Sequence, residues 1–132
     1  MRERVDLSLF SERDERYQVL YLVDFGNTIV EIGHTDNVKG TMYRYVYTED
    51  GCEAIWLSQS FDANPTTVDP RLPAELQSGI PEWEWAYCQL LDLANRAAVK
   101  ITESRFVGLS LDVYKAYARQ INIPSYKTYV LS

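Results

Sequence analysis

The 132-residue sequence is poor in the residues that mark a familiar chemistry, with one histidine, two cysteines and six glycines. The lone histidine, His34, lacks the second histidine or cysteine that zinc patterns contain. There is no G-x-S-x-G elbow, no Walker A motif and no G-x-G-x-x-G fingerprint, so neither a serine hydrolase nor a phosphate-binding glycine loop is indicated. We therefore expect a protein that is not an enzyme and that uses no cofactor and no metal.

Long apolar runs and a cysteine framework are also missing. No run approaches the roughly 20 residues that span a membrane, and the N-terminal MRERVD has mixed charge where a secretory signal has an apolar core. Cys52 and Cys88 form no C-x-x-C pattern, and we expect both to be free thiols in a reducing compartment. The predicted location is the cytoplasm, or the host cytoplasm if the gene is viral, with no membrane partner.

Basic charge is scarce, because 19 acidic side chains face 13 basic ones and the formal net charge is −6. Residues 17–81 contain nine acidic and three basic side chains, whereas residues 82–132 contain five acidic and six basic. A nucleic-acid binder normally carries a basic stripe, so we expect no nucleic-acid partner. The acidic segment of residues 17–81 would either steer a basic partner towards the protein or simply keep a β-rich face solvated.

The first half of the chain predicts strands, because apolar, β-branched and aromatic residues alternate with polar ones. The expected strands are Val5–Leu9, Tyr17–Val23, Thr28–Ile32, Met42–Thr48 and Glu53–Gln59. Turns are expected at Asp24–Asn27 and at Asp50-Gly51, the latter a two-residue hairpin turn.

The hairpin of residues 42–59 carries the central functional prediction. A two-residue turn sets its register, with Tyr45 opposite Trp56 and with Tyr43 and Tyr47 on the same face. The other face also carries apolar side chains, so both faces need cover. We therefore predict that the aromatic face binds a partner or ligand, unless the helices pack on it and a second sheet or subunit covers the other face.

The second half predicts helices. Residues 60–81 contain four prolines and no periodicity, which predicts a loop with a short helical turn at 74–77. Apolar residues then recur with helical spacing from Trp83 to Ala94, and a second helix is expected from Ser110 to Asn122. Short strands are expected at 99–102, 105–107 and 125–131. We predict one α+β domain over residues 1–132, with an antiparallel sheet of four to six strands in a hairpin meander, followed by two C-terminal helices packed on one face.

Four further residues complete the predicted binding site. Phe61 and Trp85 would extend the aromatic face from the neighbouring loop and helix, because Trp85 lies off the apolar stripe that contains Trp83. Arg105 and Arg119, in the more basic C-terminal third, would hold an anionic ligand.

We predict a small acidic binding protein whose partner is another protein or a small anionic ligand, with a homodimer as one expected oligomer. Small size and the lack of catalytic motifs are typical of phage or mobile-element inhibitors that bind a host protein or sequester a small signalling ligand. A small enzyme with an unrecognised site is an alternative from another class.

A second alternative comes from the segment Asp24-Phe-Gly-Asn-Thr, which follows one apolar strand and precedes another. This segment resembles the strand–turn–strand piece of Tudor domains. The resemblance implies a reader of methylated or cationic peptides, with Phe25 and Asn27 at the positions of an aromatic cage that binds by cation–π attraction. An ordinary hairpin turn accounts for the same residues.

Overall fold

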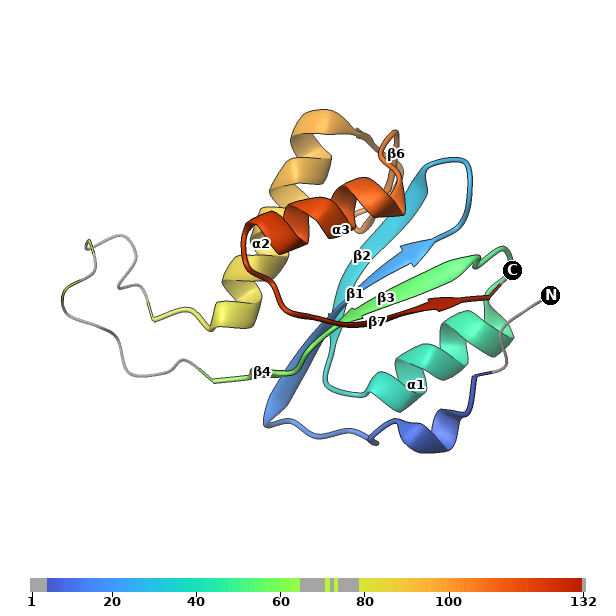
Figure 1. Cartoon of the computed structure of the whole chain (residues 1–132), viewed down its shortest axis with the longest axis horizontal. Coiled ribbons are helices and arrows are strands. Elements are labelled where there is room, and N and C mark those ends of the chain that lie inside the picture. Colours follow the sequence, from blue (N-terminus) through green and yellow to red (C-terminus); the bar gives the residue numbers. More distant parts are fainter. Residues whose placement is uncertain (1–4, 65–70, 72, 74–78, 132) are drawn as a thin grey trace.

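The computed structural model describes residues 5–64, 71, 73 and 79–131, and its centre is an antiparallel β-sheet (Figure 1). The strand order is β5-β6-β2-β1-β3-β7, and β4 pairs with β1 beside this path. The strands are β1 (Tyr17–Asp24), β2 (Ile29–Thr35), β3 (Ala54–Ser58), β4 (Phe61–Asp62), β5 (Val99–Lys100), β6 (Arg105–Val107) and β7 (Ser125–Val130).

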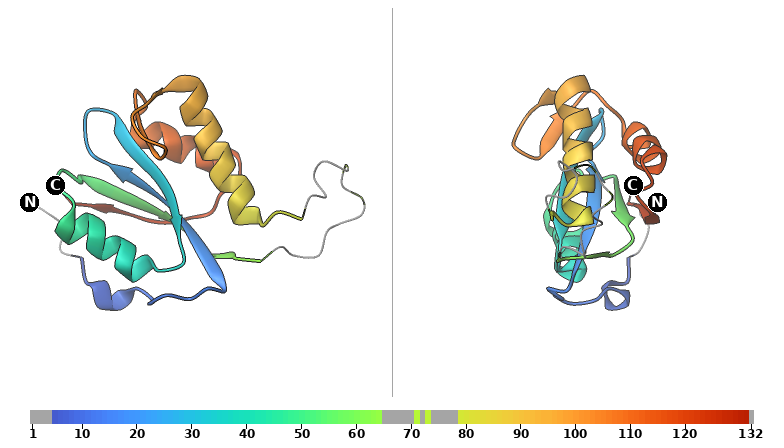
Figure 2. Two further views of the ribbon diagram at one scale, coloured as in Figure 1. Left: turned by 180° about the vertical axis from the view of Figure 1, so that it is seen from behind. Right: turned by 90° about the vertical axis from the view of Figure 1, so that its left-hand side faces the viewer.

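Helices cover both faces of this sheet, and Figures 1 and 2 show the resulting layers. The helices α2 (Glu82–Ala97) and α3 (Leu111–Gln120) lie on one face. The helix α1 (Val38–Tyr43) and a 3-10 turn, η1 (Leu7–Leu9), lie on the other. The α+β class and the antiparallel sheet are as predicted, but the order is not: α1 lies between β2 and β3, and β7 follows the last helix.

Two apolar cores form because the side chains of a strand point alternately to the two faces. On the side of α2 and α3, Trp56 of β3 packs with Leu22 of β1 and with the helical residues Leu90 and Tyr114. On the side of α1, Ile55 and its strand neighbours pack with helical side chains. That second core contains Val23, Met42, Tyr45, Val46, Ile55, Leu57 and Tyr129.

The first predicted hairpin is confirmed. Strands β1 and β2 pair antiparallel, and Gly26 and Asn27 adopt positive φ angles of 81° and 53° in the turn between them. The Asp24 carboxylate accepts a 2.9 Å hydrogen bond from the Gly26 amide, which fixes the start of the turn.

The second predicted hairpin is wrong, because residues 42–48 are helical. Helix α1 continues into one π-helical turn, η2 (Arg44–Thr48). The Asn37 side chain caps α1 by accepting a 3.0 Å hydrogen bond from the Gly40 amide. The buried residues Met42, Tyr45 and Val46 have helical spacing, whereas the alternation of three tyrosines imitates a strand.

The neighbours of β3 in the sheet are therefore β1 and β7 instead of residues 42–48. The predicted strand Val5–Leu9 is also wrong, because Asp6 accepts a 3.0 Å hydrogen bond from the Ser8 amide and caps η1. The helical turn expected at 74–77 lies outside the described residues. The strands expected at 99–102, 105–107 and 125–131 correspond to β5, β6 and β7.

Helix α3 begins and ends where its sequence predicts. The Ser110 side chain accepts a hydrogen bond from the Val113 amide at the start. At the end, Asn122 has a φ of 65°, and the Ile123 amide donates to the Ala118 carbonyl at 2.8 Å. This left-handed cap satisfies a terminal carbonyl and turns the chain sharply back into β7.

Candidate functional site

The predicted aromatic face does not form, because its members lie on different sides of the sheet. The Trp56 side chain is buried under α2 and α3 with 1% exposure, and Tyr45 of η2 is fully buried in the core on the other face. Tyr45 has no surface to offer a partner while the fold is intact, and Trp56 has almost none.

Tyr43 and Tyr47, by contrast, lie at the surface with 54% and 57% exposure. They are four residues apart on α1 and η2, and their ring centroids are 5.8 Å apart. The Tyr47 hydroxyl donates to the Val5 carbonyl at 3.2 Å, and both rings line a groove beside η1. A role for this pair in binding a partner stays a prediction.

Phe61 and Trp85 are not brought together with these tyrosines. Phe61 is buried in the core below α2 and α3. Trp85 is exposed on α2, as its position off the apolar stripe predicts, whereas Trp83 packs against that core.

Arg105 is engaged within the fold. One of its terminal nitrogens donates to the Glu31 carboxylate at 3.2 Å, and its guanidinium lies 4.0 Å from the centroid of the Phe25 ring. The Tyr45 hydroxyl donates to the other oxygen of Glu31. Burial and the contact with Glu31 raise the pKa of Tyr45, so its hydroxyl keeps the proton that this hydrogen bond needs.

This network bears on the Tudor-like alternative. Phe25 is the proposed cage residue, and the guanidinium of Arg105 already occupies one face of its ring. Tyr45 lies edge-on to the same ring at 6.3 Å, while Asn27 is exposed. A peptide cation would have to compete with a guanidinium that Glu31 also holds.

Arg119 lines a concave site on the surface, which we call the α3 groove. This groove of about 710 Å³ lies between α3, the loop that follows it, and the sheet. Trp56 is at its floor and donates from its indole nitrogen to the Ser125 hydroxyl at 2.9 Å. The residues that line it are Trp56, Asp112, Lys115, Ala116, Ala118, Arg119, Asn122, Ile123, Pro124 and Ser125.

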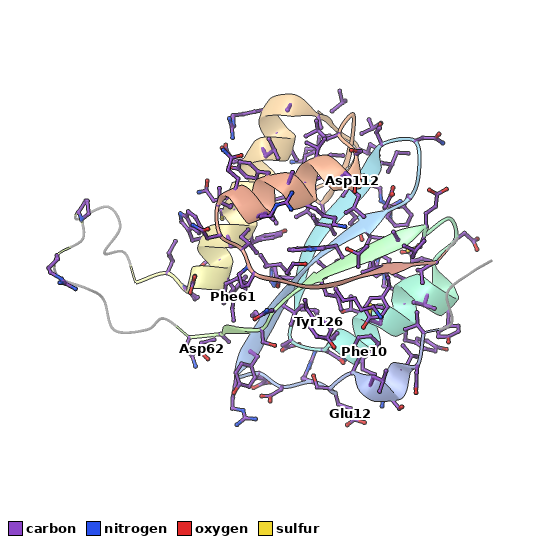
Figure 3. All side chains as sticks on the ribbon, viewed as in Figure 1. Phe10, Glu12, Phe61, Asp62, Asp112 and Tyr126 are labelled. Atoms are coloured by element: carbon purple, nitrogen blue, oxygen red, sulfur yellow. The ribbon has the colours of Figure 1, made fainter. Side chains whose placement is uncertain are left out.

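Figure 3 labels Asp112, which lines the α3 groove, and two residues that line a second hollow. Asp112 is labelled on α3, on one side of β7, while Tyr126 and Phe10 are labelled on the other side. Tyr126 and Phe10 line a smaller hollow of about 430 Å³ that reaches the core under α1. The two hollows are therefore separate sites on opposite faces of the sheet.

The charges in the α3 groove are unusual for this protein. Within the described part of the chain, neither Lys115 nor Arg119 has a carboxylate oxygen within 4.0 Å. Most other described cations do have one, although the chain as a whole is acidic. These paired cations are Arg13, Arg16, Lys39, Arg44, Arg96, Lys100 and Arg105.

Sequence reasoning identified Arg119 and Trp56 but missed their polar neighbours. Asp112, Lys115, Ala116 and Arg119 are spaced three, four and seven residues apart, so they form one stripe along α3. This stripe is a signal in the sequence. The partners of α3 across the groove, Trp56 and the loop after Asn122, depend on the tertiary fold.

His34 and the two thiols form no chemical centre. The His34 ring lies 4.5 Å from Trp83 and 4.8 Å from Tyr87, and burial between these rings lowers its pKa. Cys52 is buried and Cys88 is exposed, and neither forms a disulfide among the described residues, as predicted. In residues 5–64, 71, 73 and 79–131, no three metal-ligating side chains gather, and no helix is long and apolar enough to cross a membrane.

Comparison with known proteins adds no assignment to this geometry. No protein-family model, no curated protein and no solved structure matches the chain. The α3 groove is accordingly interpreted from its own residues.

Proposed function

We propose that the protein is a non-enzymatic binding protein that holds a small anionic ligand in the α3 groove. The observation that carries this proposal is the pair of cations, Lys115 and Arg119, one helical turn apart beside a groove of about 710 Å³. A volume of this size is typical of small-molecule sites.

The lack of carboxylate partners for Lys115 and Arg119 among the described residues supports the proposal further. A carboxylate partner would reduce the attraction that a cation exerts on an outside anion, and these two cations lack one among the described residues. Charge-assisted hydrogen bonds to an anion are about twice as strong as neutral ones. Asn122 and Ser125 add polar groups to the lining of the groove.

Sequestration of a ligand explains the groove better than capture of a host protein through the predicted aromatic face. That face would need Tyr45 and Trp56 at the surface, and both are core residues. A phage or mobile-element origin, an inhibitory role and a cytoplasmic location remain part of this proposal and rest on the small size of the chain and its lack of catalytic motifs.

The test uses Trp56 as the reporter, because its indole hydrogen bond to Ser125 lies in the groove. A Trp83→Phe, Trp85→Phe variant leaves Trp56 as the single tryptophan. We expect saturable fluorescence changes with members of an anion panel of phosphate, sulfate, citrate and cytidine 5′-monophosphate at low ionic strength.

Arg119→Gln should weaken that binding by about tenfold or more, as expected for loss of a charge-assisted hydrogen bond. Arg96→Gln is the matched control, because it removes the same charge from an exposed site on α2, where Arg96 pairs with Asp92. If no anion of the panel binds, or if the two variants behave alike, the proposal is wrong.

A further inference from the structure

A second concave surface, separate from the α3 groove, lies where the N-terminal turn η1 runs beside α1 (Figures 1 and 2). It has a volume of about 650 Å³, and we call it the tyrosine cleft. The residues that line it are Val5, Asp6, Leu7, Ser8, Tyr43 and Tyr47. The two tyrosines are more than half exposed, and Asp6 contributes a carboxylate beside them.

The helical backbone sets the relation between the two tyrosine rings. Tyr43 and Tyr47 are one helical turn apart, their ring centroids are 5.8 Å apart, and their planes are tilted by 40°. The Tyr47 hydroxyl donates to the Val5 carbonyl at 3.2 Å, which anchors this ring at the cleft. With this separation, one cation can lie within about 6 Å of both centroids, the range over which cation–π attraction acts.

Several other aromatic rings of the protein already carry a cation from the chain itself. These pairs are Arg16 over Tyr17, Arg44 over Tyr45, Arg105 over Phe25 and Lys127 over Tyr129. No cation of the described residues lies over Tyr43 or Tyr47. Arg44, which lies between them in the sequence, instead contacts Glu49 at 3.0 Å and the Tyr45 ring. The two rings of the cleft therefore keep their surface for a cation from outside the chain.

We infer that the tyrosine cleft binds a small quaternary ammonium compound of the choline type. This inference concerns a second ligand and does not rest on the anion site of the α3 groove. The Asp6 carboxylate supplies negative charge beside the rings, in a chain whose formal net charge is −6. Its side chain accepts a 3.0 Å hydrogen bond from the Ser8 amide, which fixes the carboxylate at the start of η1.

The lining of the cleft favours a cation that is covered by methyl groups. A primary ammonium carries three N–H donors, and losing their water without new acceptors is costly. A quaternary ammonium has no N–H group to satisfy, and aromatic rings are its characteristic partners in proteins. Val5 and Leu7 add apolar surface for its methyl groups. The volume of the cleft is typical of small-molecule sites, which favours a free compound over a methylated side chain of another protein.

The experiment titrates the protein with choline and with 3,3-dimethyl-1-butanol, a neutral compound of the same shape. Sodium chloride keeps the ionic strength constant, and proton–nitrogen NMR follows the backbone amides of Leu7, Ser8, Tyr43 and Tyr47. We expect choline to shift these amides saturably and to bind about tenfold or more tighter than the neutral compound, because the charge carries the attraction. Equal binding of the two compounds, or no saturable shift at these amides, would overturn the inference.

Three variants identify the groups responsible. Tyr43→Leu should weaken choline binding by about two- to fivefold, as expected for one exposed cation–π contact, whereas Tyr43→Phe should retain the binding. Tyr126→Leu is the matched control for Tyr43→Leu, because it removes an exposed tyrosine of β7 that lies outside the cleft. If Tyr43→Leu and Tyr126→Leu bind choline equally well, the rings of the cleft are not the site and the inference is wrong.

Asp6→Asn removes the charge and keeps a side chain that caps η1, so it should weaken choline binding while the protein stays folded. Unchanged affinity in this variant would contradict the role of the carboxylate. A short peptide with one trimethyllysine tests the other source of the same group, and it should bind no tighter than choline. A peptide that binds about tenfold tighter than choline would overturn the assignment to a free compound.

Discussion

Arg105 on β6 and Glu31 on β2 form a 3.2 Å ion pair between residues that are 74 positions apart in the chain. Glu31 is almost fully buried, with 6% exposure, and its second oxygen accepts from Tyr45 of η2. The pair therefore ties a late, short strand and the turn after α1 to the centre of the sheet. It stabilises the fold and leaves Arg105 poorly placed to serve a ligand.

Removal of Arg105 should destabilise the protein. Arg105→Met leaves one oxygen of a buried carboxylate without its cation, which costs about 1–3 kcal/mol. Urea unfolding measures the loss. In a double-mutant cycle with Glu31→Gln, the second change should cost less than it does alone, because the two residues share one interaction. Strictly additive losses would show that the ion pair contributes nothing.

The buried and the exposed aromatic residues should respond in opposite ways. Trp56→Ala and Tyr45→Ala each open a core cavity at a cost of about 3–5 kcal/mol, in separate cores. Their combined loss of about 6–10 kcal/mol is comparable to the whole stability of an ordinary domain, about 5–15 kcal/mol, so the double variant should lose most or all of its unfolding free energy. Tyr43→Ala with Tyr47→Ala is the control pair, and it should keep the circular dichroism spectrum and most of the unfolding free energy. A double variant of Tyr45 and Trp56 that keeps the parent's unfolding free energy would restore the predicted aromatic surface.

The pKa of His34 should lie below its usual value of 6.5, because Trp83 and Tyr87 desolvate the ring. Glu84 and Asp36 act in the other direction but less strongly. Since His34 is the single histidine, a proton NMR titration reports it without ambiguity. The pKa should rise towards 6.5 in Trp83→Ala and should not change in Trp85→Ala.

The lowered pKa of His34 also makes the stability of the fold depend on pH in a definite direction. Between the lowered folded pKa and 6.5, the unfolded state binds more protons at His34 than the folded state does. Stability should therefore fall as the pH drops through this window, and His34→Gln should remove that part of the pH dependence. A His34 pKa at or above 6.5, or a variant with the parent's pH profile, would contradict the desolvated site.

Local signals predicted those parts of the fold in which neighbouring residues decide the conformation. The positive φ angles at Gly26 and Asn27, the Ser110 cap and the reversal at Asn122 follow from residue type. Asp50-Gly51 also forms the expected turn, with a φ of 83° at Gly51. In the structure that turn joins a helix to a strand. A turn signal marks where the chain reverses and does not specify the elements on either side, so it could not reveal that residues 42–48 are helical.

The tyrosines of residues 43–47 show why the alternating pattern predicted a strand where the structure has a helix. Alternation places Tyr43, Tyr45 and Tyr47 on one face of a strand, but Tyr43 and Tyr47 are also four apart, and share a helix face. The apolar spacing of Met42, Tyr45 and Val46 selects the helix once a sheet face is available to bury it. That face is built by strands distant in sequence, so the choice depends on tertiary packing.

Part of the candidate site could also be predicted from local spacing, and part depends on the tertiary fold. Arg119 and Lys115 could be placed on one stripe of α3 from their spacing alone. The pairing of Arg105 with Glu31 depends on β6 lying beside β2, which no local pattern encodes. Without it, Arg105 and Arg119 look equivalent in sequence, although Arg119 lines the α3 groove and Arg105 is held by Glu31.

The most direct test of the account is to map where an anion binds by proton–nitrogen NMR of the labelled protein during titration with cytidine 5′-monophosphate. Saturable shifts should concentrate at Asp112, Lys115, Arg119 and the loop from Asn122 to Ser125, and the Trp56 indole resonance should move with them. Shifts centred on Phe25 and Arg105, or no saturable shift at all, would contradict an anion site in the α3 groove.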